Sequence, residues 1–298
     1  MGTIAREEKS LAKKTRDARK KKAISVSLMY IFLILGGVTM IFPFLWMIST
    51  SLKSSSSIFV FNLSDIRLIP KPVYWKNYID VWKVVPFAKF YFNSIFVCVA
   101  VTFGQVATSA LAAYAFARLK FPGRDKLFFA YLATMMIPGS VTLIPVFTMM
   151  SIFGWIDSYK ALIIPALFSA YGTFLLRQFF MTLPRDLEDA AKIDGCSTWG
   201  IFWKIILPLS NTALATLTIF VSLGNWVSFM WPLLVTNSIG KKTLPIGLAY
   251  FQELYQYAQP DWGLLMAGSL ITMVPIIIIF LFNQRFFIEG IKLTGMKG

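Results

Sequence analysis

Long apolar stretches alternate with short polar stretches along most of the chain. A bilayer core about 30 Å thick needs about 20 apolar helical residues to cross it, so stretches of that length are candidate transmembrane helices. Six stretches reach this length, at residues 23–49, 90–117, 127–153, 159–180, 209–235 and 262–286. The pattern therefore predicts an all-α integral membrane protein with six transmembrane helices.

Prolines interrupt several of these stretches, and the third stretch holds the strongest breaking signal. Pro138-Gly139 and Pro145 all fall inside it. A proline removes a backbone donor, which membrane helices tolerate where neighbouring groups satisfy the freed carbonyl. We therefore expect the third span to be bent or broken.

The composition supports a membrane location and excludes several kinds of chemistry. Hydrophobic residues make up 57% of the chain and charged residues only 14%, whereas soluble domains are about 25% charged. The sequence contains no histidine, which excludes histidine-based zinc sites and acid–base catalysis. Its two cysteines, Cys98 and Cys196, lie outside any metal-binding spacing, so we expect no metal site.

The basic residues determine the expected orientation. Most of the 29 Lys and Arg residues lie in segments 1–22, 118–126 and 177–208 and at the C-terminal end, on one side of the predicted spans. Loops rich in Lys and Arg stay in the cytoplasm, so both termini and the polar loop before residue 209 are expected there. The net charge of +15 reflects this topology, and no nucleic-acid partner is expected.

These boundaries define the expected domain organisation. We expect a basic cytoplasmic tail at residues 1–22, a six-span transmembrane domain at 23–286 and a C-terminal cytoplasmic tail at 287–298. The transmembrane domain includes outer loops at 50–89 and 236–261 and a cytoplasmic loop at 181–208. The tail 1–22 is expected to lie solvated against anionic lipid. The outer loops carry aromatic residues that suit a membrane interface or a landing surface for a solute-delivering protein, and we expect an interfacial helix in the second.

Residues 187–209, LEDAAKIDGCSTWGIFWKIILPL, form a polar interlude between the fourth and fifth apolar stretches. Pro184 suits the start of a helix whose first turn is acidic, as the helix dipole favours. Gly195 is a candidate left-handed C-cap, and Ser197 can cap a second helix. Pro208 marks the turn into the next apolar stretch. The interlude is thus predicted to be a helix, a sharp turn and a second helix.

One face of the first of these helices is small and smooth. Leu187, Ala190, Ala191 and Asp194 recur at i, i+3, i+4 and i+7, the spacing that places residues side by side on a helix. Such a face permits close approach by another protein. The spacing therefore predicts a docking surface.

The interlude resembles the EAA loop of ABC importer permeases. Asp189-Ala190-Ala191 is followed after three residues by Gly195, after nine more by Ile205, and then by Leu207-Pro208. The family usually has Glu where Asp189 stands. In that family the loop inserts into a cleft on a separate ATP-hydrolysing subunit and transmits its motion. The resemblance implies ATPase coupling by Arg185, Glu188, Asp189, Ala190, Ala191, Asp194 and Gly195.

Similarity to this family covers nearly the entire chain. PFLWMISTSLKSSSSIF from Pro43, AYAFARLKFPGR from Ala113 and LGNWVSFMWPLLV from Leu223 look like its carbohydrate-uptake branch, in particular the maltose-permease second subunit type. The resemblance implies the type I ABC importer permease fold, a multi-pass location in the bacterial cytoplasmic membrane, and a carbohydrate substrate, either an oligosaccharide or a glycoside. It also implies assembly with a second homologous permease subunit, two ATP-binding subunits and an extracytoplasmic solute-binding protein.

The sequence carries no motif for an energy source of its own. Gly195 and Gly200 have phosphate-loop spacing, but Ile201 and Phe202 stand where Lys and Ser or Thr are needed. No acidic residue lies near the middle of a predicted span, where an ion-coupled carrier needs one. We therefore expect a non-catalytic subunit without a cofactor, with ATP and Mg²⁺ bound by the partner ATPase.

Neutral polar residues in the spans are candidates for the solute path. Hydrogen-bonding groups beside aromatic rings suit a sugar, which is bonded along its edge and stacked on its faces. The candidates are Tyr171, Asn225, Trp226 and Ser228, although polar residues that join helices fit the same pattern. The family often has Asn and an acid after this Trp, where this chain has Val227 and Ser228.

Other functions stay open at this point. A permease for a non-sugar solute would share all these features. A self-sufficient carrier or channel would explain six spans but not the EAA-like loop. A membrane-bound enzyme is the weakest alternative, because the sequence lacks histidine, metal clusters and paired intramembrane carboxylates.

Overall fold

The computed structural model describes residues 2–54, 70–254 and 261–295, and in these ranges the chain is helical without a β-strand. In chain order the helices are α1 (Gly2–Ser51), α3 (Asn77–Val84), α4 (Phe87–Arg118), α5 (Arg124–Ala133), η2 (Thr134–Met136), α6 (Gly139–Ile152), α7 (Tyr159–Ile163), η3 (Ile164–Leu167), α8 (Ala170–Thr182), α9 (Asp186–Ile193), α10 (Thr198–Ile201), η4 (Phe202–Ile206), α11 (Leu207–Leu209), α12 (Asn211–Trp226), α13 (Met230–Val235), η5 (Ile239–Lys241), α14 (Leu244–Leu254) and α15 (Trp262–Gly295). Of these, η4 is a π-helix and the other η elements are 3-10 helices. The predicted all-α class is confirmed.

Four helices in the described ranges are long and apolar enough to cross a membrane. They are Ile24–Ser51, Phe87–Arg118, Tyr159–Thr182 and Trp262–Phe282. Two further candidates are pairs of helices joined at a sharp bend, which raise the number of spans to six if each pair counts as one. The structure therefore gives four to six spans, and the number six stays a prediction.

The third apolar stretch breaks where its prolines predict. Arg124–Met136 and Gly139–Ile152 meet at 100°. Pro138 stands at the bend with an extended backbone (ψ 136°) and precedes the first residue of α6, while Pro145 lies inside α6 without ending it. The prediction of a broken third stretch is confirmed.

The fifth apolar stretch is not one continuous helix. α12 ends at Trp226 and α13 begins at Met230. Pro232 accounts for the gap, because it has no N–H to donate to the carbonyl four residues earlier and its ring crowds that carbonyl. At the other end, Thr198–Leu209 bends away from α12 by 78°. The predicted turn at Pro208 is confirmed.

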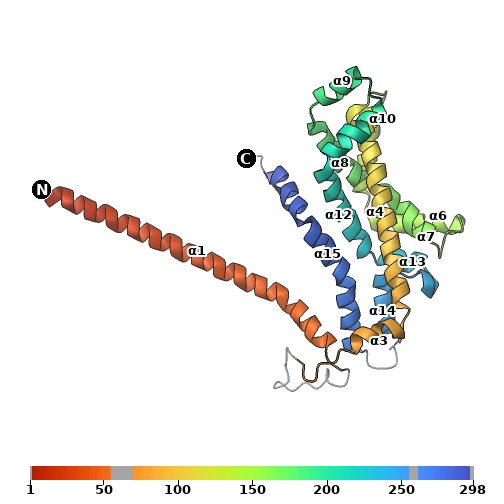
Figure 1. Cartoon of the computed structure of the whole chain (residues 1–298), viewed down its shortest axis with the longest axis horizontal. Helices are drawn as coiled ribbons and strands as arrows, with labels where there is room; N and C mark the ends of the chain where they lie inside the picture. The colour runs from red at the N-terminus through yellow and green to blue at the C-terminus, as the bar shows by residue number, and fades with distance from the viewer. Residues whose placement is uncertain (1, 55–69, 255–260, 296–298) are drawn as a thin grey trace.

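α4 is the central helix of the bundle (Figure 1). It packs against α8, α12 and α14. It contributes to two cores, one shared with α8, α10, η4 and α12 and the other with α3, α14 and α15. One straight helix therefore connects both ends of the molecule.

α1 leans away from this bundle (Figure 1), and the most apolar part of Ile24–Ser51 has no buried residue. It is held at its C-terminal end, where the Asn77 amide of α3 donates to the carbonyls of Ser51 and Lys53 at 2.8 and 2.9 Å. Its first turns include the basic tail, which is helical from Gly2 onward. An apolar helix that is exposed along most of its length is suited to lipid or to another membrane helix.

The 236–243 loop, which joins α13 to α14, is attached to α4 by hydrogen bonds. The fully buried Asn93 amide donates to the carbonyls of Gly240 and Lys242 at 3.0 and 2.9 Å and accepts from the Tyr159 hydroxyl at 2.7 Å. Ser94 accepts from the backbone of the residue that begins α14 at 2.8 Å. α14 is the helix expected in the second outer loop, and residues 255–260 of that loop lie outside the described ranges.

Asp157 holds the same loop from the other side. One carboxylate oxygen accepts 3.0 Å hydrogen bonds from the Asn237 N–H, the Ser238 N–H and the Ser238 hydroxyl. Burial acts to raise the pKa of Asp157, but the hydrogen bonds from Ser238 and Asn237 outweigh it and lower that pKa. Its φ of 60° is left-handed, a conformation that Asp tolerates better than most residues.

Gly172 permits the close packing of α8 on α4. A Cβ at this position would lie 2.6 Å from the Ser109 hydroxyl and 3.3 Å from a Leu217 methyl. We expect Gly172→Ala to lower the free energy of unfolding by about 1–3 kcal/mol, the usual cost of overpacking. Gly224→Ala on α12 is the control, since a Cβ there meets nothing within 4 Å. Equal thermal stability of the two variants in detergent would contradict this account.

Asp157→Ala tests how the 236–243 loop is fastened. The variant loses the three hydrogen bonds and strains a left-handed backbone, so we expect about 1–3 kcal/mol of destabilisation. Because the carboxylate has a lowered pKa, the difference from wild type persists into acidic solution and disappears only as the pH falls through that pKa. Asp157→Gly separates the two causes, since it keeps the backbone and loses the bonds. Thermal melts at several pH values provide the measurement.

Candidate functional site

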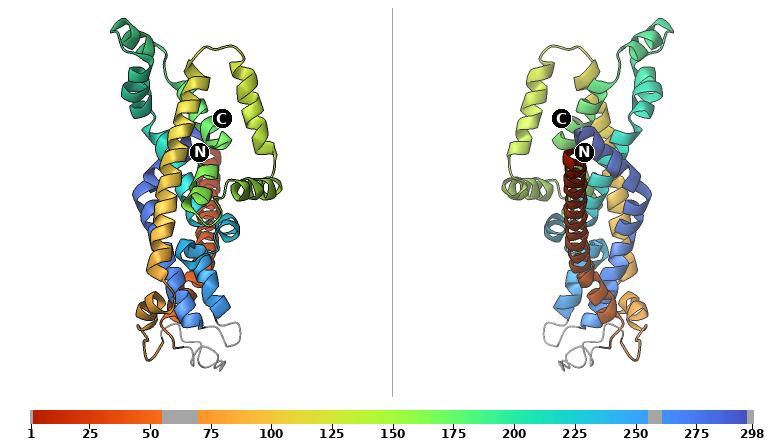
Figure 2. Two further views of the ribbon diagram at one scale, coloured as in Figure 1. Left: turned by 90° about the vertical axis from the view of Figure 1, so that its right-hand side faces the viewer. Right: turned by 90° about the vertical axis from the view of Figure 1, so that its left-hand side faces the viewer.

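Residues 184–208, here called the polar segment, lie at one end of the molecule. α9 and α10 project beyond the bundle at the end opposite α3 (Figures 1 and 2). α9 begins at Asp186, two residues after Pro184, and its first turn is acidic as predicted.

A tight turn ends α9. Gly195 has a φ of +79°, the left-handed conformation predicted for it. Its N–H donates to the Lys192 carbonyl at 3.0 Å, and the Cys196 N–H donates to the Ala191 carbonyl at 2.8 Å. These two bonds form a Schellman motif, which satisfies carbonyls that the helix leaves free. The predicted C-cap is confirmed.

The second half of the polar segment is a capped helix with a π-turn. The Ser197 hydroxyl accepts from the Gly200 N–H at 3.1 Å and caps α10, which confirms the predicted cap. The π-helix η4 follows, and Pro208 lies just before the 78° bend into α12. π-turns and prolines both weaken the regular helical ladder. The polar segment therefore joins α12 through a bent connection.

The two sides of α9 differ in solvent exposure. Glu188 and Ala191 are its buried residues, at 6% and 7% exposure. The residues that point away from the bundle, here called the outward face, are Asp186, Asp189, Ala190 and Ile193. Ile193 is 87% exposed, more than most residues of this size in any part of the structure.

Sequence spacing placed the docking face on Leu187, Ala190, Ala191 and Asp194. Of these, Ala191 is buried against its own chain, whereas the other three are exposed. The outward face has the same i, i+3, i+4, i+7 spacing starting at Asp186. Helical periodicity gives the spacing but not the rotation of the helix about its axis, and here the rotation is fixed by Glu188.

Arg118, the last residue of α4, fixes that rotation. Its Nε lies 2.8 Å from a carboxylate oxygen of Glu188, and both side chains are less than one-tenth exposed. The two atoms lack the angle of a hydrogen bond, so the contact is an ion pair. The same guanidinium donates to the carbonyls of Phe180 and Leu183 at 2.6 and 2.8 Å. Glu188 is therefore turned inward.

The other predicted residues of the polar segment, Arg185, Asp189, Asp194 and Gly195, are exposed. Lys192 donates to the Asp189 carboxylate at 2.9 Å, and this hydrogen bond lowers the pKa of Asp189. Asp189 is thus ionised at neutral pH and faces outward. The two neighbouring acids differ in their surroundings, because Glu188 is buried against Arg118 of α4, whereas Asp189 is exposed and pairs with Lys192 of its own helix.

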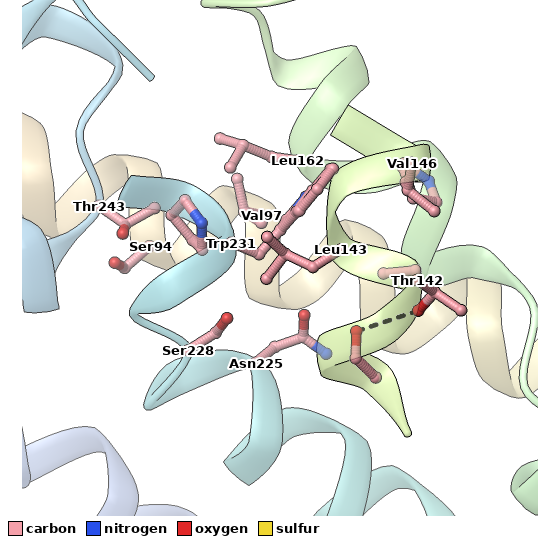
Figure 3. A pocket seen from close by; sticks show the side chains of 14 residues that line it. Ser94, Val97, Thr142, Leu143, Val146, Leu162, Asn225, Ser228, Trp231 and Thr243 are labelled. Carbon is pink, nitrogen blue, oxygen red and sulfur yellow. Dashed lines mark hydrogen bonds between the residues drawn. The ribbon is translucent and has the colours of Figure 1, made fainter. Parts of the chain in front are cut away.

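A pocket of about 320 Å³ lies within the bundle (Figure 3). It forms where α6 begins after Pro138, where η3 interrupts the helix before α8, and where α12 and α13 are separated. Non-helical backbone at membrane depth is tolerated only where it is buried in protein or lines a cavity. The breaks and the pocket therefore belong together.

Uncharged side chains line the pocket. Asn225 and Ser228 point into it beside Trp231 (Figure 3). Trp231 is held in place by its N–H, which donates to the Ala161 carbonyl at 2.9 Å. Thr243 also lines the pocket, and its buried hydroxyl has no hydrogen-bond partner among the described residues. Such a hydroxyl is costly unless water or a ligand pairs with it.

The structure separates the four residues suggested for the solute path. Asn225 and Ser228 line the same pocket. Trp226 is buried elsewhere, since its N–H donates to the Thr272 carbonyl at 3.1 Å and its ring packs on Tyr91. Tyr171 packs on Phe220 and does not line the pocket either.

Four residues of these two sites were not predicted from the sequence. Arg118 and Ile193 define the orientation of α9, and Trp231 and Thr243 line the pocket. The sequence could have indicated Ile193, because it is adjacent to Asp194 of the predicted face. For Arg118 the sequence showed only that it lies in a basic loop. Within the described ranges, no group of three His, Cys, Asp or Glu residues is arranged to hold a metal ion.

Comparison with known proteins agrees with these features. An arabinooligosaccharides transport system permease protein from Halalkalibacterium halodurans is 36% identical over 261 residues, covering 87% of this chain and 91% of the relative. An sn-glycerol-3-phosphate transport system permease protein from Yersinia pestis is 34% identical over 269 residues, covering 88% and 94%. The fold matches that of a bacterial ABC transporter involved in the import of the acidic polysaccharide alginate, with a TM-score of 0.79, 22% identity and coverage of 89% and 96%.

The family model covers the part of the chain that holds both sites. It matches residues 105–292, which include the polar segment and most of the pocket. The chain belongs to the family of binding-protein-dependent transport system inner membrane components.

Proposed function

We propose that the chain is the transmembrane permease subunit of an ATP-driven importer for a carbohydrate, an oligosaccharide or a glycoside. Family membership supports the permease role, and the arabinooligosaccharide relative supports the substrate class. The observation that carries the coupling mechanism is the outward face of α9, which exposes Ile193 at the projecting end of the molecule.

The outward face has the properties of a docking surface for an ATP-binding subunit. Leaving an Ile side chain in water forfeits about 1.5–3 kcal/mol that burial would supply. Ala190 allows close approach beside it, and Asp186 and Asp189 add two negative charges. The complementary surface is an apolar cleft with a basic rim. ATP and Mg²⁺ are bound by that partner, and this chain holds no cofactor.

The remaining partners follow from the family and from α1. A binding-protein-dependent transporter receives its solute from an extracytoplasmic solute-binding protein, for which the outer loops are candidate landing surfaces. The unburied apolar surface of α1 suits contact with a second, homologous permease subunit as well as with lipid. Two ATP-binding subunits complete the complex. Both termini and the polar segment face the cytoplasm of a bacterial cell, and the chain crosses its inner membrane six times.

Coupling in this proposal is mechanical. ATP binding closes the pair of ATP-binding subunits and moves the docked polar segment. The movement passes to α12 through the bent π-helical connection and to the bundle through Arg118. The spans then rock between inward-facing and outward-facing arrangements.

The pocket provides a path for an uncharged solute. Asn225, Ser228 and Thr243 offer hydrogen-bonding groups, and the Trp231 ring offers a face for stacking. Among the residues that the structure describes, no charged residue lines it, which favours a neutral sugar over an anion such as the glycerol phosphate named for one relative. A self-sufficient carrier stays the weaker alternative, because it gives the outward face of α9 no role.

Ile193→Asp tests docking without disturbing the fold, because the side chain is exposed. Placing an unpaired carboxylate in a protein interface costs several kcal/mol, so the ATP-binding subunit should no longer co-purify and solute-stimulated ATPase activity should fall by about tenfold or more. Ile239→Asp, at an exposed Ile in an outer loop far from α9, is the control for co-purification of the ATP-binding subunit. Full stimulation in Ile193→Asp would rule out the outward face as the docking surface.

Asn225→Leu and Ser228→Ala test the solute path. Each removes a hydrogen bond worth about 0.5–1.5 kcal/mol, so the KM for transport in vesicles should rise by about two- to tenfold for each substitution. Thr218→Val on the same helix α12 is the control, because Thr218 lies outside this pocket. An unchanged KM in both pocket variants would place the solute elsewhere.

A further inference from the structure

Three separate segments meet at the guanidinium of Arg118. It ends α4, it donates to the carbonyls of Phe180 and Leu183 at the end of α8, and it pairs with Glu188 in α9. The carbonyls at the end of a helix have no partner within that helix, so Arg118 also caps α8. One buried side chain thus connects the two most closely packed helices of the bundle to the projecting helix.

α9 has few other attachments to the bundle. Glu188 and Ala191 are its buried residues, and Ala191 is a small side chain in apolar contact. The covalent connections on both sides are a short loop after α8 and the turn at Gly195. Loops and turns bend under load, whereas a buried ion pair resists both rotation and separation. Glu188 is therefore the polar anchor that keeps α9 in a fixed orientation on the bundle.

The geometry suits arginine better than lysine. One guanidinium nitrogen, Nη2, donates to both carbonyls, while Nε of the same rigid plane lies 2.8 Å from the Glu188 carboxylate as an ion pair. A lysine ammonium keeps the charge but not this planar fork. Tyr114, one turn earlier on α4, adds a contact to the far side of the Gly195 turn, since its hydroxyl donates to the Thr198 carbonyl at 3.4 Å.

We propose that Arg118 is a positioning residue for energy coupling, which locks α9 to the ends of α4 and α8 so that a push on α9 moves both helices as one body. This inference rests on the proposed function, because it needs an ATP-binding subunit to move α9. It assigns Glu188 to force transmission within the chain and leaves partner contact to Asp189 and Ile193.

The first measurement concerns the chain alone, in lipid nanodiscs. Spin labels at Thr182→Cys in α8 and Lys192→Cys in α9, in a background without Cys98 and Cys196, report the distance between the two helices. We expect a narrow distribution in the parent and a broad one in Arg118→Lys and in Glu188→Gln. Arg177→Lys is the matched control, since Arg177 is also a mostly buried arginine on the bundle, bonded to the Phe116 carbonyl and stacked on Phe128, and none of these partners belongs to α9.

The second measurement uses the complete importer in proteoliposomes, with its ATP-binding subunits and solute-binding protein. Here we expect Arg118→Lys and Glu188→Gln to lower the amount of solute transported per ATP hydrolysed by about fivefold or more, the low end of typical coupling between sites. A merely structural role would lower the amount of assembled complex without changing this ratio. Arg177→Lys should keep the ratio of the parent.

The inference is supported if both Arg118→Lys and Glu188→Gln show a broad distance distribution and transport less solute per ATP hydrolysed. A narrow distribution in Glu188→Gln overturns it, and so does a broad distribution with the ratio of the parent. If the Ile193→Asp complex still assembles and shows full ATPase stimulation, the docking proposal fails, because the ATP-binding subunit then does not move α9 through the outward face. That failure is recognised separately, because the distance measurement does not involve the partners.

Discussion

The constraint on which this structure depends is that backbone groups left free by a broken helix must find partners where water is excluded. Side chains of α4 supply many of them. Asn93 serves the carbonyls of the 236–243 loop, Thr108 donates to the Leu167 carbonyl where η3 ends, and Arg118 serves the last carbonyls of α8. α4 itself runs unbroken for 32 residues. The irregular parts of the fold are thus organised around one regular helix.

The combination of broken helices with one continuous helix fits a molecule that changes shape. Helices bend where their hydrogen-bond ladder is interrupted, and the interruptions lie in the third, fourth and fifth apolar stretches around the pocket and in the connection from the polar segment to α12. The continuous α4 packs against α8 and α12, next to these interruptions. Broken helices therefore line the pocket, while an unbroken helix packs beside them.

Sequence reasoning succeeded where one local rule decides the structure. Apolar length identified candidate spans, Pro138 the break before α6, and Gly195 and Ser197 the two caps of the polar segment. It failed where a distant residue decides. Trp226 was a candidate for the solute path, but its N–H donates to the Thr272 carbonyl of α15 and its side chain lies away from the pocket. The resemblance to a family identified the polar segment but not which side of α9 faces the bundle.

The rotation of α9 is itself an argument for a partner. A helix that packs only on its own chain buries its larger apolar residues, yet α9 buries Ala191 and exposes Ile193. Turning the helix to bury Ile193 would carry Glu188 away from Arg118, leaving a buried charge unpaired at a cost of about 3–5 kcal/mol. That exceeds the roughly 1.5–3 kcal/mol gained by covering an isoleucine. The ion pair therefore decides the rotation, and the apolar surface it leaves outside is recovered only when another protein covers it.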